Sequence, residues 1–143
     1  MTSLTTADLA LLAEARRATL ATIAPDGQPR LVPVCYAVVD DTIWIALDDK
    51  PKTVEDVREL ARVRDVVARP AVSLLVDRWS EDWSALAWIR LYGTADLVEP
   101  RDVPAMVIPA LVTRYPQYRD HDLEHRPLLR IAPERVSRWS ASG

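Results

Sequence analysis

The sequence predicts a mainly β protein: a small closed or split barrel of six antiparallel strands, decorated with helices. Short apolar runs of strand length recur along the chain, and turn sequences separate them. Helical spacing occurs in only a few segments, which do not alternate regularly with the strands as in a parallel α/β fold. Six curved antiparallel strands can close most of their edges against one another, and this favours a barrel.

A helix and three strands are expected in the first third of the chain. The helix is TTADLALLAEARRA at 5–18, where Thr5 and Asp8 have the spacing of a capping box. The strands are expected at 19–24, 29–39 and 42–47. Short turns separate them, so they are predicted to form an antiparallel meander.

The rest of the chain adds two helical segments and three strands. Val57 and Leu60 recur at helical spacing after Thr53, which predicts a second helix there. Pro104 and Pro109 interrupt a third helical segment at 102–115. The strands are expected at 71–78, 86–99 and 128–140, with a bend or bulge at Gly93.

Composition excludes several functional classes. With 143 residues, 49% hydrophobic and 27% charged, the chain is predicted to be one globular domain spanning 1–143. A net charge of −3 does not favour nucleic-acid binding, and no apolar run approaches the length of a membrane span. The N-terminal segment lacks the basic region of a signal peptide, and the single cysteine allows no internal disulfide. The expected location is the cytoplasm.

The stretch DDKPKTVED at 48–56 has two readings. Lys50 and Lys52 flank Pro51 on an extended segment and should point to the same side, just before a helix that Thr53 and Asp56 could cap. Two ammonium groups beside free helix-end N–H groups would form a seat for an anion such as phosphate. The same residues also suit an ordinary capped helix start with two solvated lysines.

Pro33 lies inside the predicted strand at 29–39, where a central strand would need its N–H group. The strand is therefore expected at an edge, at a bulge, or where a flat ligand meets the backbone. Cys35 and Tyr36 in the same segment are predicted to be packed side chains, although Tyr36 could also donate a proton.

Other candidate sites have weaker support. The segment from His121 to His125 matches the H-x-x-E-H zinc pattern, but Pro116 and Pro127 leave little room for the helix that this motif requires, so no metal is expected. Trp83 and Trp88 could stack on an aromatic ring or could belong to the core or a dimer interface. No paired-carboxylate, nucleophile or nucleotide-loop motif is visible, so an enzyme of this sequence would use a cofactor for its chemistry.

Four segments in order resemble one family. ATLATIAPDGQPRLVPVCYAV, ALDDKPKT, ARPAVSLLVD and DWSALAWIRLYGTADL are similar to the FMN-binding split β-barrel family of flavin- and deazaflavin-binding proteins, which includes the pyridoxamine-phosphate-oxidase-like proteins. The resemblance covers about residues 8–140. Within the family, the sequence most resembles the actinobacterial branch that uses the deazaflavin coenzyme F420.

The resemblance implies a homodimer that binds a cofactor in a groove at the subunit interface. It assigns the cofactor phosphate to Lys50, Pro51, Lys52 and Thr53, and places the ring system along Arg30, Leu31, Val32, Pro33 and Val34. Arg58, Trp83 and Ser84 complete the cofactor-binding residues that it implies, and no catalytic side chain is assigned. The implied activity is hydride transfer between F420 and a small electron-poor organic substrate. An FMN-dependent enzyme and a non-catalytic F420 or flavin carrier are the alternatives.

Overall fold

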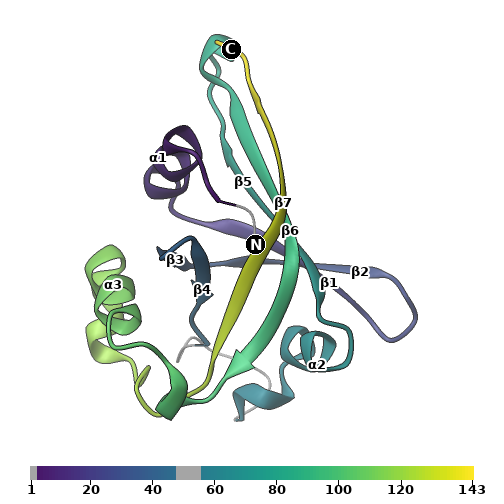
Figure 1. Cartoon of the computed structure of the whole chain (residues 1–143), viewed down its shortest axis with the longest axis vertical. Coiled ribbons are helices and arrows are strands. Elements are labelled where there is room, and N and C mark those ends of the chain that lie inside the picture. The colour runs from purple at the N-terminus through teal and green to yellow at the C-terminus, as the bar shows by residue number, and fades with distance from the viewer. Residues whose placement is uncertain (1–2, 48–55) are drawn as a thin grey trace.

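In the computed structural model, residues 3–47 and 56–143 are described, and they form one curled sheet with three α-helices (Figure 1). The protein is therefore mainly β, with the architecture of a split barrel, as the sequence predicts. The strands are β1 Ala18–Ile23, β2 Pro29–Val34, β3 Tyr36–Val39, β4 Thr42–Ile45, β5 Ala71–Arg78, β6 Ala87–Val98 and β7 Leu128–Ser140. Their order across the sheet is β2-β1-β5-β6-β7-β4-β3.

The sheet has seven strands where six were expected, because the predicted strand at 29–39 is broken at Cys35. Before the break, β2 pairs with β1, with Val34 opposite Ala18. After it, β3 pairs with β4, with Tyr36 opposite Ile45. Both antiparallel pairings of the predicted meander are therefore present, but its middle strand changes partner at Cys35 and divides it into two hairpins at opposite edges of the sheet order.

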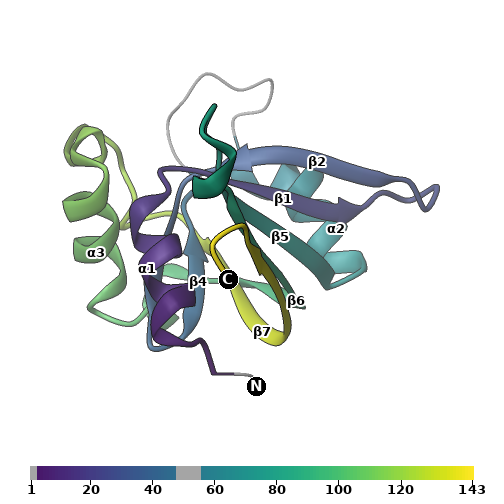
Figure 2. The same ribbon diagram turned by 90° about the horizontal axis from the view of Figure 1, so that it is seen from above.

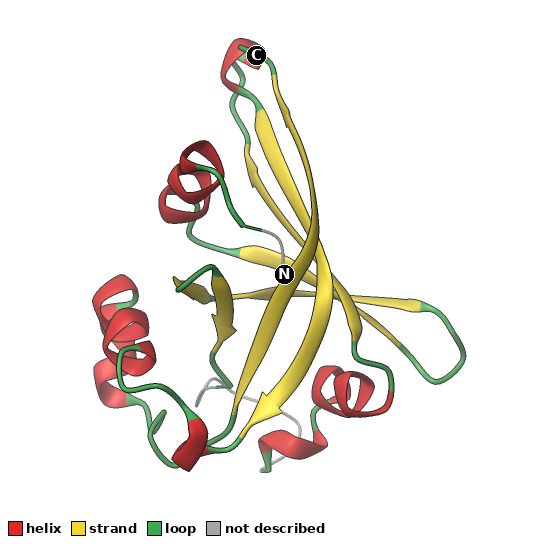
Figure 3. Ribbon diagram, viewed as in Figure 1, coloured by secondary structure: helices red, strands yellow, loops and turns green. Residues whose placement is uncertain are grey.

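The break at Cys35 also curls the sheet. Because β2 and β3 are the two terminal strands of the sheet order and one residue joins them, the two edges must meet at that residue. Consecutive Cα atoms are about 3.8 Å apart, so β2 and β3 are close together on either side of Cys35. They can move apart only at positions farther from this residue. The result is a barrel closed at the junction of β2 and β3 and open beyond it (Figure 3).

The first helix, α1 Thr6–Glu14, has the predicted capping box. The N–H of Thr5 donates to Oδ2 of Asp8 at 2.9 Å, and the N–H of Asp8 donates to Oγ1 of Thr5 at 3.1 Å. Asp8 is buried, and its carboxylate also accepts two hydrogen bonds of 2.8 Å from Arg138 on β7. Burial alone would raise the pKa of Asp8, but the hydrogen bonds from Arg138 and Thr5 outweigh it and lower the pKa.

The second helical segment differs from the expectation. A 3₁₀ turn, η1 Val57–Glu59, precedes the helix α2 Ala61–Ala68, and the extended Leu60 separates them. Asp56 is not the third residue of a helix begun at Thr53. It is extended and caps η1 itself, because its Oδ1 accepts the N–H of Arg58 at 2.9 Å. Thr53 lies outside the described residues.

The predicted interruption of the third helical segment is confirmed at Pro104 but not at Pro109, which lies in the first turn of the helix α3 Val107–Arg114. The segment contains a short turn, η3 Pro100–Asp102, and then α3, while a further turn, η4 Pro116–Asp120, follows. Proline begins both 3₁₀ turns, where its missing N–H would have no intrahelical partner. Another turn, η2 Trp83–Ala85, lies between β5 and β6.

Two apolar clusters hold these elements together. The larger one packs Leu12 of α1 and Val63 of α2 against the inward side chains of the sheet, including Leu20 and Leu74. The smaller one packs α3 against β3 and β4 around Leu111 and other buried side chains. Figure 2 shows α2 beside the hairpin of β1 and β2, and α3 on the opposite side of the molecule. Within the described ranges, no helix is both long and apolar enough to cross a membrane.

Gly93 lies at the irregularity in the pairing of β6 with β7, which confirms the predicted bulge. A Cβ atom at this position would lie 2.1 Å from the carbonyl oxygen of Ala132, a backbone atom that cannot rotate away. The two longest strands therefore approach each other closely at Gly93.

We expect Gly93→Ala to lower the free energy of unfolding by about 2–3 kcal/mol, because the added methyl group must displace the β7 backbone. Urea denaturation measures this change. The control is Glu81→Ala, at an exposed position between β5 and η2, where stability should be unchanged. Equal stability of the two variants would contradict the close approach.

Candidate functional site

The strand β2, which was predicted to lie under a ring, is an edge strand in the described sheet. It pairs with β1 alone, so Pro33 removes no ladder hydrogen bond on its outer side. Arg30, Val32 and Val34 alternate with the exposed Leu31 and Pro33 along the strand. Val34 is buried, and Val32 packs against the main core, while the side chain of Leu31 is 66% exposed. β2 thus offers solvent a free backbone edge and a small apolar face.

The predicted phosphate seat of Lys50, Pro51, Lys52 and Thr53 lies outside the described residues. The strand that leads to it, β4, ends at Ile45, and the next two residues, Ala46 and Leu47, are buried. On the other side of the seat, Asp56 is the N-cap of η1.

Arg58, at the centre of η1, faces two carboxylates. Its Nη2 lies 2.5 Å from Oε1 of Glu99, and its Nη1 lies 3.5 Å from Oδ1 of Asp56. The hydrogen bond to Glu99 is the main reason that the pKa of Arg58 is raised. Because Glu99 follows β6, this ion pair ties η1 to the lower end of that strand in Figure 1.

Trp83 and Ser84 lie in η2, before the start of β6. Asp82 caps this turn by accepting the N–H of Ser84 at 3.1 Å and its Oγ–H at 2.6 Å, and Trp83 is 70% exposed. Arg58 is tied to the far end of β6, which has 12 residues and therefore spans about 40 Å. One protomer does not bring Trp83 and Ser84 together with Arg58.

The side chain of Arg30 points to α2, where it joins a cluster around one buried carboxylate. Asp65 Oδ2 accepts hydrogen bonds from Nε of Arg30 at 2.7 Å and from Oγ1 of Thr22 at 2.8 Å. Nη2 of Arg69 lies 3.6 Å from the other oxygen, Oδ1. Burial acts to raise the pKa of Asp65, but the hydrogen bonds from Arg30 and Thr22 outweigh it, so the pKa is lowered and the carboxylate is ionised at neutral pH.

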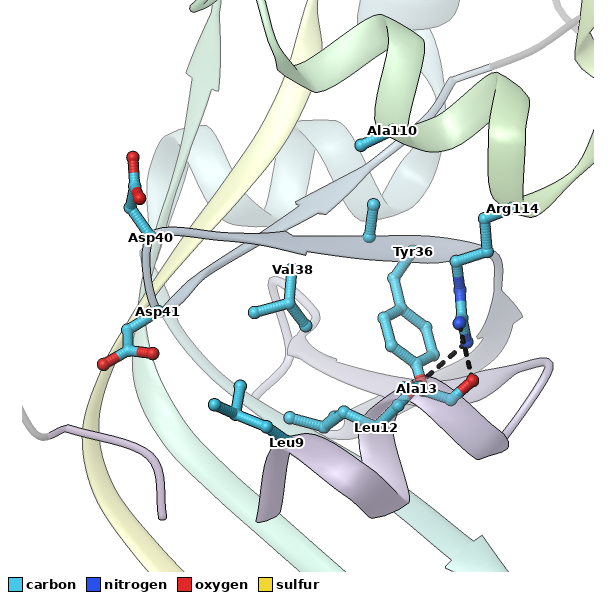
Figure 4. A pocket seen from close by; sticks show the side chains of 10 residues that line it. Leu9, Leu12, Ala13, Tyr36, Val38, Asp40, Asp41, Ala110 and Arg114 are labelled. Carbon is cyan, nitrogen blue, oxygen red and sulfur yellow. Dashed lines mark hydrogen bonds between the residues drawn. The ribbon is translucent and has the colours of Figure 1, made fainter. Parts of the chain in front are cut away.

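A cavity of about 400 Å³ lies between α1, β3 and α3 (Figure 4). Its walls include Leu9, Leu12 and Val38, and Asp40 and Asp41 lie at the end away from Arg114. The cavity is mainly apolar.

Arg114 is held at the other end of this cavity by backbone carbonyls. It donates to the carbonyl oxygens of Leu12 at 3.0 Å and Ala13 at 2.9 Å, and also to that of Ala15. Its guanidinium lies 4.7 Å from the centre of the Tyr36 ring. This arrangement fixes the end of α1 against α3 and β3.

Tyr36 is a packed side chain, as expected. It is fully buried and donates its hydroxyl proton to the carbonyl oxygen of Leu12 at 2.6 Å. Burial raises its pKa to about 12, so the hydroxyl is protonated at neutral pH. Cys35 is partly buried against the smaller core cluster, but it lies at the break between β2 and β3 and not within a strand.

The H-x-x-E-H segment is not helical. The turn η4 ends at Asp120, His121 is its extended C-cap, and Nδ1 of His125 lies 2.9 Å from Oδ1 of Asp122. Among the residues that the structure describes, no group of three or more His, Cys, Asp or Glu side chains could hold a metal ion.

A profile of the pyridoxamine 5'-phosphate oxidase family matches residues 4–140, which is nearly the whole chain. The chain belongs to this family. The match spans the hairpins at both edges of the sheet and the long strands between them. A search of curated proteins found no match.

Solved structures of the same fold include proteins with different described roles. A conserved hypothetical protein from Mycobacterium tuberculosis is 26% identical, with a TM-score of 0.74 over 97% of this chain and 86% of its own. An F420 reductase is 21% identical, with a TM-score of 0.62 over 90% of this chain and 94% of its own. The heme storage protein of Vibrio cholerae is 16% identical, with a TM-score of 0.69 over 97% and 95%.

Sequence reasoning assigned Arg30 to the cofactor but missed its partner on α2. The sequence carried little sign of this: Asp65 follows Val63 by two residues, about 200° around the helix, so it lies off the apolar stripe of Val63 and Val66 although all three are buried. Its burial requires a hydrogen-bonding partner, since a buried, unpaired carboxylate is strongly unfavourable. This chain thus carries a structural ion pair between α2 and the strand that the resemblance assigns to the ring.

Asp65→Asn should lower the free energy of unfolding at pH 7 by about 2 kcal/mol, because it removes charged hydrogen bonds from a buried site. The pKa of Asp65 is depressed on folding, so its contribution is present above the unfolded pKa, near 4, and is lost as pH falls further. Urea denaturation at pH 7 and at pH 3 should therefore show the difference from wild type shrinking in acid. Asp77→Asn, at an exposed position on β5, is the control, and an equal loss in both variants would contradict the prediction.

Proposed function

We propose that this family member is an F420-dependent oxidoreductase that transfers a hydride between the deazaflavin and a small electron-poor organic molecule. The observation that carries the proposal is the free edge of β2, with the exposed Leu31 and Pro33 on it, in a chain of this family. An unpaired strand edge presents N–H and C=O groups that can bind the polar rim of a flat ring. The likeness in fold to an F420 reductase agrees with the proposal.

In this proposal, the cofactor phosphate is held by Lys50 and Lys52, while the hydroxyl of Thr53 adds a contact. Two ammonium groups close together favour a dianion over water because each forms charge-assisted hydrogen bonds. Asp48, Asp49 and Glu55 flank the lysines in the sequence and partly neutralise their charge. Because salt screens the remaining attraction between the lysines and the phosphate, the affinity for the cofactor should fall as salt rises. Arg58 already faces Glu99 and Asp56, and in this proposal its contact with the cofactor uses the N–H groups that remain.

The backbone from Val32 to Val34 orients the ring, and Pro33 stiffens that segment because its φ angle is fixed. When bound, reduced F420 supplies the hydride, and the chain contributes orientation and exclusion of water. Tyr36 is no source of the accompanying proton, because its hydroxyl is buried and donates to Leu12. Two alternatives to this proposal are an enzyme that binds FMN at the same residues and a carrier that binds F420 without turnover.

The proposed assembly is a homodimer. On the outer side of the sheet, where neighbouring strands pair, Trp88 lies opposite Trp139, and Leu75 lies opposite Arg90. Leu75 is 39% exposed and Trp139 is 46% exposed, so apolar side chains reach solvent here. A second copy on this face would cover them, and it would also allow Trp83 and Ser84 of one protomer to approach the cofactor of its partner.

Fluorescence titration should show F420 binding more tightly than FMN to the wild-type protein. Lys52→Ala should weaken F420 binding about ten- to a hundredfold, as expected for the loss of a charge-assisted hydrogen bond. Arg101→Ala, which removes an exposed charge elsewhere, should leave the affinity unchanged.

Tight FMN binding without F420 binding would exclude the proposed cofactor. Equal F420 affinities of wild type and Lys52→Ala would remove the phosphate seat from the proposal. F420 binding with no oxidation of the reduced coenzyme by quinones, enones or tetrapyrroles would identify a carrier instead of an enzyme.

Leu75→Arg should convert the dimer to a monomer, because a charge would be buried without a partner at the proposed interface. Light scattering coupled to gel filtration measures the molar mass, and circular dichroism shows whether the fold is retained. Val67→Arg is the matched control, since Val67 is exposed on α2 and should not change the mass. A monomeric wild-type protein would disprove the assembly.

A further inference from the structure

We infer that Arg30, Arg64 and Arg69 form a second anion-binding site, separate from the lysine seat, which takes a phosphate or carboxylate group of a small molecule. The inference rests on described residues alone and does not depend on the proposed function. These arginines come from β2 and from the region of α2, and they lie around the buried carboxylate of Asp65.

The site is a cavity of about 240 Å³ between α2 and the turn that joins β1 to β2. Its lining consists of Pro25, Arg30, Ala61, Arg64, Asp65, Ala68 and Arg69. The two alanines and the proline are small and leave room for a ligand group among the guanidinium groups. Both views of the ribbon place α2 beside the β1–β2 hairpin (Figures 1 and 2).

Asp65 fixes two of the arginines while leaving most of their donors unused. Arg30 gives Asp65 its Nε–H group, and Arg69 gives its own Nε–H to the carbonyl oxygen of Ile23 at 2.8 Å, with Nη2 near Asp65. A guanidinium group has five N–H donors, so both side chains keep several for a ligand. Their orientation is set before an anion arrives, which reduces the entropy cost of binding.

The charge balance of the cavity favours an anion. Three guanidinium groups face one carboxylate in its lining, and Asp26 of the adjoining turn adds one negative charge near Arg30. Asp65 is already committed to Thr22 and to the arginines, and its lowered pKa shows that it stays charged. A net positive charge therefore remains, partly shielded from water by α2 and the turn.

Arg64 is the residue that a purely structural role does not explain. Arg30 joins β2 to α2 through Asp65, and Arg69 joins the end of α2 to β1 through the carbonyl oxygen of Ile23, so each has a structural role. Arg64 is exposed and forms no ion pair with another residue in the part of the chain that the structure describes, yet it lines the same cavity. Planar guanidinium groups bind phosphate and carboxylate oxygens in pairs, so this chemistry defines the ligand class.

The test is a titration of the apo protein with pyrophosphate, followed by amide chemical shifts in NMR. The variant Lys50→Ala/Lys52→Ala is the background, because it removes the lysine seat. We expect shifts in residues 25–30 and 61–69, and Arg64→Ala in that background should weaken binding about tenfold, as expected for losing one charge-assisted contact. Arg17→Ala, at an exposed arginine after α1, is the matched control and should have no effect.

Shifts that vanish in the Lys50→Ala/Lys52→Ala background, or equal affinities of Arg64→Ala and Arg17→Ala, would overturn the inference. Neither result would bear on the binding of F420 by the lysine seat, so the two proposals can fail separately.

Adding F420 to the wild-type protein identifies the source of the anion. If F420 displaces pyrophosphate from residues 25–30 and 61–69, the site holds an acidic group of the coenzyme. If both bind together, it holds an acidic group of a different molecule. Both results support the site.

Discussion

The rest of the structure depends on one covalent constraint: Cys35 alone connects the two edge strands of the sheet. A sheet with this strand order cannot be flat, because β2 and β3 would then be separated by the width of five strands. The sheet has to curl until its edges meet, and the inner face of the curl becomes the place where α1 and α2 bury Leu12, Val63 and their neighbours. The strand order thus determines both the barrel and the layer of helices that fills it.

The same constraint explains why β2 can serve as a binding strand. Because the sheet is joined at Cys35 and open farther along, the outer side of β2 has no pairing strand in the described residues. A free edge is normally a liability for aggregation, and Pro33 limits that risk because it offers no N–H group to an invading strand. The ion pair between Arg30 and Asp65 then holds the outer end of the hairpin against α2. β2 therefore has an unpaired edge, and its position is still fixed by an ion pair.

Sequence patterns located most strands well, since β5 and β7 have the bounds that were predicted for them. They predicted the extended conformation of 29–39 and both of its antiparallel pairings, but not the break at Cys35, because an apolar pattern indicates conformation and not the point at which a strand changes partner. The helix expected after Thr53 begins later, at Ala61, since Asp56 caps a 3₁₀ turn. Of the expected site residues, Arg30 and Arg58 have acidic partners that are distant in sequence, and pattern reading could not pair them.

The ion pair of Asp8 with Arg138 joins residues 130 positions apart in the chain. Its consequence concerns biosynthesis: α1 leaves the ribosome before the seven described strands, but the arginine that fixes its capping carboxylate is on the last of them. Until β7 emerges, β4 and β6 also lack the neighbour that lies between them. The nascent protein therefore exposes an unfinished sheet during most of its translation, a state that chaperones bind.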